Sequence, residues 1–337
     1  MVGAGKRMMH VVQYDRYGGG PAGLKHVEVP VPTPGKDEVL LKVEAVSINP
    51  VDWKIQKGVM RPFVPPKFPH IPGSDVAGEV VEVGGGVKNF KPGDKVVTFI
   101  GISMGGGMGE FAIAKGSFLV PIPQQVSPTE AAALPVAAVT AYRALTHVVG
   151  LKLDGSETGP PKNILVTAAS GGVGTYAVQL AKLGNAHVTA TCGSRNMDLV
   201  RSLGADEVLD YKTPEGASLR SPSGKKYDGV IHCTTGISWS RFEPELSNNG
   251  KVVDLTPGPS TMTRFALQKL TFSKKKVVPL IIVYSEERIG DLGYLVGLVK
   301  EGKLKSVIDS KYPLSRAEEA WGKSIDGHAT GKIVVEP

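Results

Sequence analysis

The fold is decided by the stretch Ile164-Leu-Val-Thr-Ala-Ala-Ser-Gly-Gly-Val-Gly-Thr-Tyr-Ala-Val-Gln-Leu-Ala-Lys182. An apolar run of strand length passes through a glycine-rich turn into a segment with the periodicity of a helix. Gly171 and Gly174 occupy the second and third positions of a G-x-G-x-x-G pattern, and Ala169 stands at the first. In this context the pattern predicts a cradle for the phosphates of a dinucleotide at the N-terminus of the helix.

The two glycines have separate roles in such a turn. Without a side chain, Gly171 lets the backbone approach a pyrophosphate, and Gly174 lets the helix pack close to the strand. A tight turn with a purely structural role is the alternative, because a glycine pattern alone is a weak signal. The prediction assigns cofactor contacts to five consecutive residues of the turn: Ser170, Gly171, Gly172, Val173 and Gly174.

The end of the next strand predicts which dinucleotide binds. An NAD-selective site places Asp or Glu about 20 residues after the turn, where it bonds the ribose 2′-hydroxyl. Here the sequence is Thr-Cys-Gly-Ser-Arg at residues 191–195 and offers no carboxylate. Ser194 and Arg195 can instead bond a 2′-phosphate, so the predicted cofactor is NADPH. A solvated cation at a helix start is the alternative role of Arg195.

The residue pattern changes along the chain at about residue 130, and the full length of 337 residues suggests about two domains. Up to about residue 130, short runs of β-branched residues such as 39–45 and 76–83 alternate with turns rich in Pro and Gly. This pattern predicts a closed or nearly closed antiparallel barrel. Beyond this part of the chain, apolar strands alternate with helices, which predicts a parallel sheet covered on both faces. Residues 213–226 are rich in Pro, Ser, Gly and Lys and are predicted to form a surface loop.

Composition narrows the class of protein. With 41% hydrophobic and 21% charged residues the chain can bury ordinary cores, so it is not a disordered protein. No run of 18 apolar residues is present that would span a membrane. The net charge of +7 suits phosphate-bearing ligands or an anionic membrane surface. Since aromatic residues do not interleave the basic ones, we expect no nucleic acid partner.

The cysteines and the N-terminus bear on the compartment. Cys192 and Cys233 sit inside apolar runs without paired spacing, which favours a reducing compartment over a disulfide framework. Lys6 and Arg7 precede no apolar segment, and a strand pattern has begun by Met9. We therefore expect neither a secretory signal nor a long transit peptide. The chain is expected to be a soluble intracellular protein.

Motifs from end to end of the chain resemble the medium-chain dehydrogenase/reductase family, in its zinc-free quinone oxidoreductase branch. The resemblance implies an α/β protein with a GroES-like β-barrel catalytic domain at residues 1–128 and 286–337. It implies a doubly wound parallel-sheet Rossmann domain that binds NADPH at residues 129–285. The motifs are Asn-Pro-Val-Asp at 49–52, Pro-Gly-Ser-Asp-Val-Ala-Gly at 72–78, Lys-Pro-Gly-Asp-Lys-Val at 91–96, Ala-Leu-Pro at 133–135, the glycine turn, and Leu-Gly-Ala-Asp at 203–206.

Zinc-containing members of this family hold a catalytic metal with a Cys, a His-Glu pair and a second Cys. The corresponding positions here are Asn49, Ser74 with Asp75, and about Val136. An amide, a hydroxyl and an aliphatic chain do not make a tetrahedral zinc site, so we predict no metal. Without a Lewis acid, alcohol oxidation lacks its usual stabilisation of an alkoxide. A zinc alcohol dehydrogenase is therefore the disfavoured alternative.

The resemblance implies NADPH-dependent reduction of the activated C=C bond of α,β-unsaturated carbonyls, or of quinones, by hydride transfer without a metal. The substrate is expected to be small and lipophilic: a long-chain enone or enal, or a γ-ketol. Two alternatives stay open. One is an enone or iminium reductase recruited to plant specialised metabolism. The other is a non-catalytic relative that binds NADPH or RNA.

The resemblance also implies residue roles. Asn49 would lie beside the nicotinamide and the substrate carbonyl, and Thr140 under the nicotinamide ring. The alternatives are a turn-capping Asn and a helix hydroxyl bonded to its own backbone. Tyr142 is a candidate proton donor, with water as the alternative, and Asp52 and Lys54 are expected to form a supporting pair. The remaining cofactor contacts that the resemblance implies are Ser194, Tyr211, Cys233, Thr234, Leu255 and Thr256.

Within that branch the chain is similar to the plant chloroplast-envelope members. This similarity implies peripheral attachment to the inner chloroplast envelope without a cleaved transit peptide, with the cytoplasm as the alternative. Lys269 and the run Lys274–Lys276 predict reversible binding to an anionic membrane, unless they solvate a loop near the subunit interface of a homodimer. Met104 and Met108, in a glycine-rich loop, predict an adaptable apolar mouth for long-chain substrates.

Overall fold

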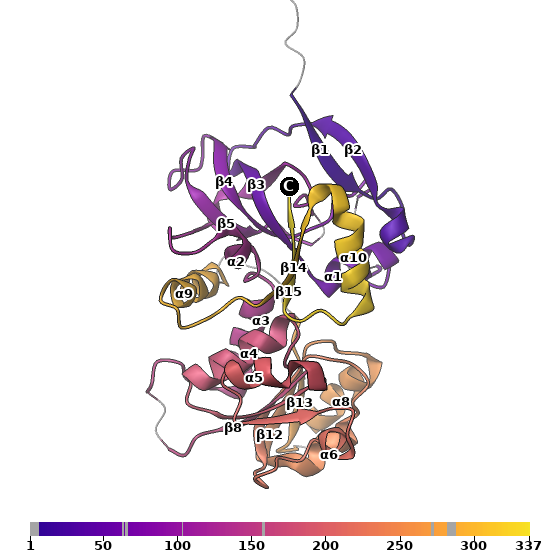
Figure 1. Ribbon diagram of the computed structural model, residues 1–337, viewed down its shortest axis with the longest axis vertical. Helices are drawn as coiled ribbons and strands as arrows, with labels where there is room; N and C mark the ends of the chain where they lie inside the picture. The colour runs from indigo at the N-terminus through magenta and orange to yellow at the C-terminus, as the bar shows by residue number, and fades with distance from the viewer. Residues whose placement is uncertain are drawn as a thin grey trace, which may run out of the picture. The chain divides into compact units, whose positions relative to one another are not determined.

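The computed structural model divides the chain into two compact units (Figure 1). One unit comprises Met1–Val136 with Tyr284–Pro337, and the other comprises Ala137–Val283. The first boundary falls after Val136 rather than after residue 128, because helix α2 (Pro128–Ala132) packs on strands of the first unit. The predicted boundary at 285/286 lies outside the described residues. The structure describes residues 7–62, 64, 67–102, 104–156, 159–270 (without the side chain of residue 269), 273–281 and 288–337.

The first unit is built on a seven-stranded sheet with the order β14-β15-β3-β4-β5-β7, and β6 also pairs with β3. The pairs among strands of the first 130 residues are antiparallel, as the sequence predicts, and β15 also pairs antiparallel with β3, whereas β14 and β15 of the C-terminal segment run parallel. A parallel pair needs a crossover, and helix α10 supplies it. The strands are β3 (Glu38–Ile48), β4 (Asp75–Val83), β5 (Lys95–Phe99), β6 (Phe111–Lys115), β7 (Val120–Pro121), β14 (Ile308–Pro313) and β15 (Lys332–Glu336); β1 (Met8–Gln13) and β2 (Lys25–Pro30) form a separate hairpin sheet.

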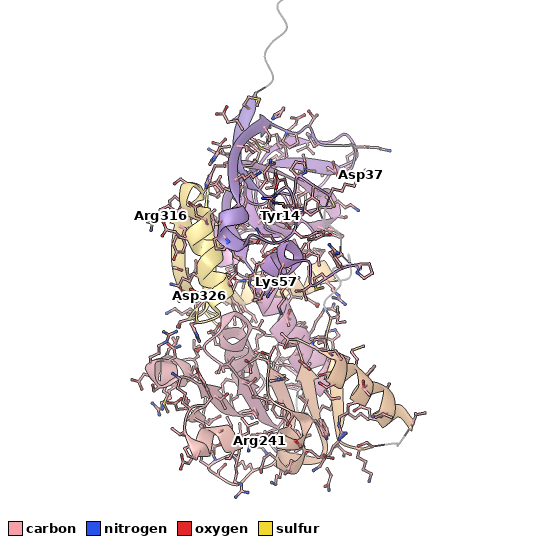
Figure 2. The ribbon with its side chains drawn as sticks, turned by 90° about the vertical axis from the view of Figure 1, so that its right-hand side faces the viewer. Tyr14, Asp37, Lys57, Arg241, Arg316 and Asp326 are labelled. Atoms are coloured by element: carbon pink, nitrogen blue, oxygen red, sulfur yellow. The ribbon has the colours of Figure 1, made fainter. Side chains whose placement is uncertain are left out.

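Helix α10 (Ala317–Asp326) ties the C-terminal segment to the core of the first unit. Its buried residues Ala317, Ala320 and Trp321 follow helical spacing, so they form one apolar face. The fully buried indole of Trp321 donates from Nε1 to Oε1 of Gln56 in α1 (Pro50–Lys57), over 2.9 Å. Figure 2 shows α10, between Arg316 and Asp326, beside the end of α1 at Lys57.

The second unit is a six-stranded parallel sheet with the order β10-β9-β8-β11-β12-β13, the doubly wound order that the sequence predicts. The order reverses between β8 and β11, and doubly wound sheets bind their ligands at the carboxyl ends of the strands at such a switch point. Figure 1 shows helices α4 and α5 on one side of this sheet. The strands are β8 (Asn163–Thr167), β9 (His187–Cys192), β10 (Glu207–Asp210), β11 (Tyr227–His232), β12 (Leu246–Asp254) and β13 (Lys276–Pro279).

The predicted surface loop at 213–226 contains a helix, α6 (Pro214–Ser218), so that prediction is wrong in part. Its N-cap is Thr213, whose hydroxyl accepts a hydrogen bond from the backbone N–H of Gly216 over 3.1 Å. Proline at the first helical position and a capping threonine start this single turn despite its poor composition. The remaining helices are α3 (Ala137–Arg143), which continues as a π-helix (Ala144–Val149), α4 (Gly172–Leu183), α5 (Met197–Ser202), α7 (Trp239–Phe242), α8 (Pro259–Leu270) and α9 (Ile289–Lys300).

Candidate active site

The glycine turn between β8 and α4 has no space for a side chain at its last glycine. A Cβ atom on Gly174 would lie 2.3 Å from the carbonyl oxygen of Ala168 and 2.7 Å from the Cα of Ala169. At Gly171 the corresponding contact with the same oxygen is 3.3 Å. Helix α4 therefore begins directly against the end of β8, as close packing of helix and strand requires.

The N-terminus of α4 is suited to hold a pyrophosphate. The helix is 12 residues long, and its first N–H groups have no partner within the helix. The aligned peptides place a partial positive charge at the same end. Ser170 and Gly171–Val173 are half-buried there, so the backbone remains accessible. Asn196, from the loop after β9, donates from Nδ2 to Oγ of Ser170 over 3.1 Å and joins the two loops.

Three more predicted cofactor residues leave the sheet at the same edge as the glycine turn. β8, β9 and β10 are parallel neighbours, and Asp210 pairs with Cys192 at their ends. Ser194 and Arg195 follow β9 and are exposed. Tyr211 follows β10, is 48% exposed, and donates its N–H to the carbonyl of Cys192 over 3.1 Å. A guanidinium, a hydroxyl and an aromatic ring are groups that can bind a phosphorylated ribose and its base.

Polar residues link the carboxyl ends of the neighbouring strands β8, β11 and β12. Oγ1 of Thr167, at the end of β8, lies 3.0 Å from Nδ1 of His232 and accepts the N–H of Cys233 over 3.0 Å. The hydroxyl of Thr256 donates to the carbonyl of Thr234 over 2.9 Å, and Leu255 donates its N–H to the carbonyl of His232. The predicted cofactor residues that follow β11 and β12 thus lie together at one edge of the sheet. Sequence reasoning missed Thr167 and His232, although a polar residue ending an apolar strand was the available signal.

Cys233 is partly buried and has the properties of an unreactive thiol. Burial raises its pKa to about 12. Its Sγ lies 3.7 Å from the carbonyl oxygen of Ile231. Because the thiolate is the reactive form, this thiol is not a nucleophile near neutral pH.

Thr140 and Tyr142 do not share a face of α3. They are two positions apart, and residues at that spacing point in different directions from a helix. Thr140 is 7% exposed. The half-buried ring of Tyr142 lies edge-to-face with the ring of His147, with centroids 6.0 Å apart. The separate roles of Thr140, under the nicotinamide ring, and of Tyr142, as a proton donor, stay predictions.

In the first unit, Asn49 lies at the centre of a buried polar cluster. Its Nδ2 donates to Oδ2 of Asp75 over 2.8 Å, and its Oδ1 accepts from Nζ of Lys332 over 2.6 Å. The hydroxyl of Ser47 also donates to Oδ2 of Asp75, over 3.2 Å. Every side chain in this cluster is at least 95% buried. Sequence reasoning missed Lys332, whose partners come from strands far away in the chain.

Asp52 belongs to the same cluster and not to a pair with Lys54. Its Oδ2 accepts the N–H of Asn49 over 2.7 Å, and its Oδ1 accepts the hydroxyl of Ser74 over 3.3 Å. The ammonium of Lys54 lies instead 5.7 Å from the centre of the Trp53 ring. Burial raises the pKa of Asp52 to about 7 and raises the pKa of Asp75, and it lowers the pKa of Lys332.

The residues at the family's zinc positions do not fit zinc. At one position, Val136 offers a backbone N–H, which donates to Oδ2 of Asp75 over 3.2 Å and cannot ligate a cation. Asn49 is bonded at both ends of its amide. Within the described residues, no group of three or more His, Cys, Asp and Glu side chains could hold a metal ion. We therefore derive no step through a metal.

The structure differs from the predictions at two places: at the methionines of the expected substrate mouth and at the lysine run. Met108 is fully buried in the core of the first unit, so only Met104, at 57% exposure, remains for an adaptable mouth. In the lysine run, the ammonium of Lys275 donates a hydrogen bond to the carbonyl oxygen of Glu243 over 2.7 Å, whereas Lys274 and Lys276 are exposed. The side chain of Lys269 lies outside the described residues. None of the helices that the structure describes is long and apolar enough to span a bilayer.

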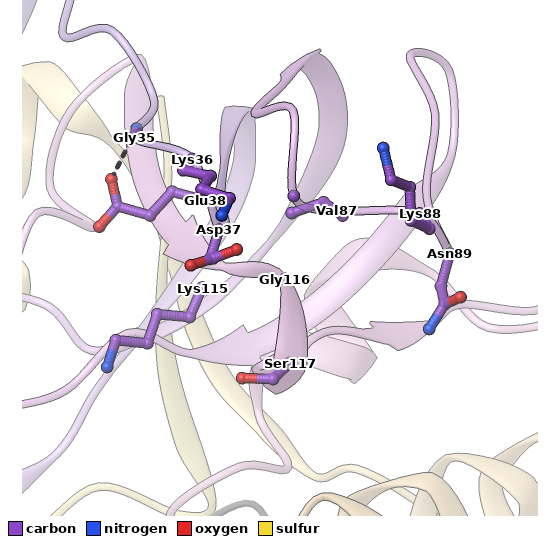
Figure 3. A pocket seen from close by; sticks show the side chains of 11 residues that line it. Gly35, Lys36, Asp37, Glu38, Val87, Lys88, Asn89, Lys115, Gly116 and Ser117 are labelled. Atoms are coloured by element: carbon purple, nitrogen blue, oxygen red, sulfur yellow. Dashed lines mark hydrogen bonds between the residues drawn. The ribbon is translucent and has the colours of Figure 1, made fainter.

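A hollow of about 820 Å³ on the first unit is lined by none of the predicted site residues (Figure 3). Lysine and acidic side chains both line it, among them Lys36, Lys115 and Asp37. Glu38 turns back to accept the N–H of Gly35 over 2.9 Å. The mixed charges at its surface indicate no particular ligand.

Comparisons with known proteins agree with this architecture. Residues 35–124 match the alcohol dehydrogenase GroES-like domain, and residues 203–335 match the zinc-binding dehydrogenase family. The chain is 67% identical to the chloroplast envelope quinone oxidoreductase homolog of Arabidopsis thaliana, over 99% of this chain and 100% of that protein. It is 32% identical to an A. thaliana protein, the chloroplastic NADPH-dependent alkenal/one oxidoreductase, over 96% of this chain and 78% of that protein.

A solved structure, Escherichia coli quinone oxidoreductase complexed with NADPH, superposes with a TM-score of 0.81 at 25% identity, over 97% of this chain and 100% of that one. The GroES-like and Rossmann units together define a two-domain dehydrogenase architecture. The chain belongs to the medium-chain dehydrogenase/reductase family, in its quinone oxidoreductase branch, and is an oxidoreductase.

We predict that Asp52→Asn makes folding stability less sensitive to pH. Burial raises the pKa of Asp52 to about 7 in the folded chain, while an unfolded chain holds Asp near about 3.9. The folded state therefore keeps a proton that the unfolded state releases, and stability falls as pH rises from about 4 to about 7. Urea unfolding at about pH 5 and at about pH 8 gives the free energy of unfolding at each pH. Between these two pH values, this free energy should fall by roughly 1–3 kcal/mol more in the wild type than in the variant.

Glu207→Gln is the matched control. Burial raises the pKa of Glu207, but hydrogen bonds from Ser221, Thr189 and Ser223 outweigh it and lower the pKa to about 2. The folding stability that the ionised Glu207 contributes is therefore present above about pH 4.3 and is lost as pH falls through about 2, which lies outside the tested pH range. Equal pH dependence in the wild type and Asp52→Asn would contradict the assignment to Asp52.

Proposed function

We propose that this oxidoreductase reduces the activated C=C bond of α,β-unsaturated carbonyls, or quinones, with NADPH. The observation that carries the proposal is the polarised amide of Asn49, buried between an ammonium and a carboxylate where zinc relatives hold their metal. Support comes from the A. thaliana relative whose name states NADPH-dependent alkenal/one oxidation and reduction, and from the relative named a quinone oxidoreductase homolog. The substrates we propose are enals, enones and γ-ketols of long chain.

The chemistry that NADPH supplies when bound is a hydride, delivered to the electron-poor β-carbon of the acceptor. The acceptor's C=C bond becomes a single bond, and the electron pair moves to the carbonyl oxygen as an enolate. In this proposal the amide N–H of Asn49 donates to that oxygen while its charge grows. A proton then adds to the α-carbon, from water or from Tyr142. With a quinone, hydride and proton together give the hydroquinone.

The turn at Ser170–Gly174 would hold the pyrophosphate, and Ser194 and Arg195 the 2′-phosphate. Tyr211, Cys233, Thr234, Leu255 and Thr256 would line the rest of the cofactor, with Thr140 below the nicotinamide. The fit rests on the close approach at Gly174 and on the exposed groups at the carboxyl edge of the sheet. A recruited reductase of specialised metabolism would use the same residues on another enone or an iminium.

We predict that the purified chain oxidises NADPH when 2-alkenals, γ-ketols or quinones are added. Loss of NADPH absorbance across this panel measures the activity, and product analysis should show a saturated α,β bond. Treatment with a strong chelator should leave the rate unchanged, since no step uses a metal. A chain that binds NADPH but reduces nothing in the panel would favour a binding protein. A rate that is lost on chelation and restored by zinc would favour an alcohol dehydrogenase.

We predict that Arg195→Ala raises the KM for NADPH far more than the KM for NADH. A charged hydrogen bond to the 2′-phosphate contributes roughly 1.5–3 kcal/mol, which corresponds to about ten- to a hundredfold in KM. Arg201→Ala is the control, because Arg201 is an exposed arginine of the following helix and pairs with Asp198. Equal effects on both cofactors would contradict NADPH selectivity through Arg195.

We also propose that the protein resides in the chloroplast, attached peripherally to the inner envelope. The support is the relative whose name places it in the chloroplast envelope, together with the +7 net charge and the exposed Lys274 and Lys276. The cytoplasm is the alternative location. A homodimer that covers these lysines is the alternative use of this surface.

We predict that the protein sediments with anionic vesicles at low salt and is released at high salt. Each lysine near the surface adds about 1 kcal/mol of attraction, which salt screens. Lys274→Ala/Lys276→Ala should weaken sedimentation, and Lys275→Ala should weaken it less, because that ammonium is bonded within the fold. Absence of sedimentation at low salt, or sedimentation that persists at high salt, would contradict an electrostatic attachment.

A further inference from the structure

The last strand of the first unit brings a buried ammonium to Asn49. β15 pairs antiparallel with β3, and Ile333 lies opposite Ile48, so Lys332 is next to Asn49. Gly331 precedes it with a φ of 89°, and a Cβ there would lie 2.2 Å from the carbonyl oxygen of Val307. The backbone that delivers the lysine therefore requires glycine at this point. Nζ of Lys332 donates to Oδ1 of Asn49 over 2.6 Å and lies 3.3 Å from the carbonyl oxygen of Ile48.

These partners fix the orientation of the Asn49 amide. An ammonium can only donate hydrogen bonds and a carboxylate can only accept them, so Oδ1 must face Lys332 and Nδ2 must face Asp75. Nδ2 carries two hydrogens, and its bond to Asp75 uses one of them. The amide lies between a positive and a negative group, which polarises it and makes the second N–H a stronger donor.

We propose that Lys332 is a positioning residue for the reduction: it holds the Asn49 amide in the one orientation that offers its second N–H to the substrate carbonyl oxygen. This inference rests on the proposed function. In this proposal Lys332 touches neither substrate nor cofactor. Its effect reaches the reacting atoms through Asn49, whose N–H stabilises the negative charge that the oxygen gains as hydride adds to the β-carbon.

The competing account gives Lys332 a structural role alone. Asp52 and Asp75 are both buried, and a buried cation compensates part of their charge. On that account, any substitution that keeps the cluster's net charge should serve equally well. On our account, keeping the net charge restores folding but does not restore the orientation of Asn49. The two accounts therefore differ in a measurable way.

The experiment compares Lys332→Met with the double variant Lys332→Met/Asp75→Asn in the full-length chain. The single variant leaves two buried carboxylates without the ammonium, and we expect it to unfold at a lower temperature. The double variant removes one negative and one positive charge together, so its thermal midpoint should recover most of this loss. The amide that Asp75→Asn introduces can both donate and accept, and therefore no longer fixes the orientation of Asn49.

For the double variant we expect kcat with NADPH and 2-hexenal to stay about ten- to a hundredfold below the wild type. The dissociation constant for NADPH should change little, because the residues predicted to hold the phosphates and the adenosine end of the cofactor lie in the other unit. Lys323→Met, a lysine of α10 that pairs with Asp309, is the control and should keep the wild-type kcat. A double variant with the kcat of the wild type would overturn the proposal.

A second measurement does not depend on activity. The side-chain amide signals of Asn49 in an NMR spectrum can be assigned by their disappearance in Asn49→Asp. In the wild type, these two protons should exchange slowly with solvent, and in the double variant they should exchange much faster. Unchanged exchange would contradict an orienting role for Lys332. If the wild type reduces nothing in the substrate panel, the proposed function fails, while this exchange still tests what Lys332 does.

Discussion

The first unit depends on the burial of two carboxyl groups together with one ammonium. Asp52, Asp75 and Lys332 are each less than 5% exposed. An unpaired charge at such depth costs several kcal/mol, so each group needs partners that the fold must bring to it. Those partners come from β3, β4, the start of α1 and β15, and only the pairing of β15 with β3 delivers the lysine. The C-terminal strand is therefore part of the core of this unit, although almost the whole chain separates it from β3.

The second unit meets its polar demands in another way. Three neighbouring strands of its sheet, β8, β11 and β12, each end on a polar residue at the carboxyl end: Thr167, His232 and Asp254. Burial lowers the pKa of His232, so its imidazole stays neutral beside the hydroxyl of Thr167. Asp254 accepts hydrogen bonds from the N–H of Thr256 and the hydroxyl of Thr261. These short contacts fix the loops that leave the sheet, and the predicted cofactor residues are carried on those loops.

Much of the second unit could be predicted from the sequence because its signals are local. A strand, a glycine turn and a helix are contiguous at 164–182, and parallel neighbours follow from their alternation. The misses have physical reasons of two kinds. α6 is a single turn started by Thr213 and a proline, which a composition rich in turn residues conceals. Lys332 owes its position to strand pairing over a long separation, and Met108 is buried in a core built from distant segments, so no window of sequence contains their partners.

The polar cluster also gives a reason why a dehydrogenase scaffold can change its chemistry while it keeps its backbone. A zinc ion accepts electron pairs directly and can hold an alkoxide, but it needs Cys, His or carboxylate ligands with free lone pairs. Here a backbone N–H and the amide of Asn49 occupy such positions, and the nearest positive charge is a tethered ammonium. An ammonium can orient and polarise a hydrogen-bond donor, but it cannot act as a Lewis acid. Such a site is better suited to stabilise charge that appears on an acceptor's oxygen than to ionise an alcohol, which is why we place reduction of an activated double bond before alcohol oxidation.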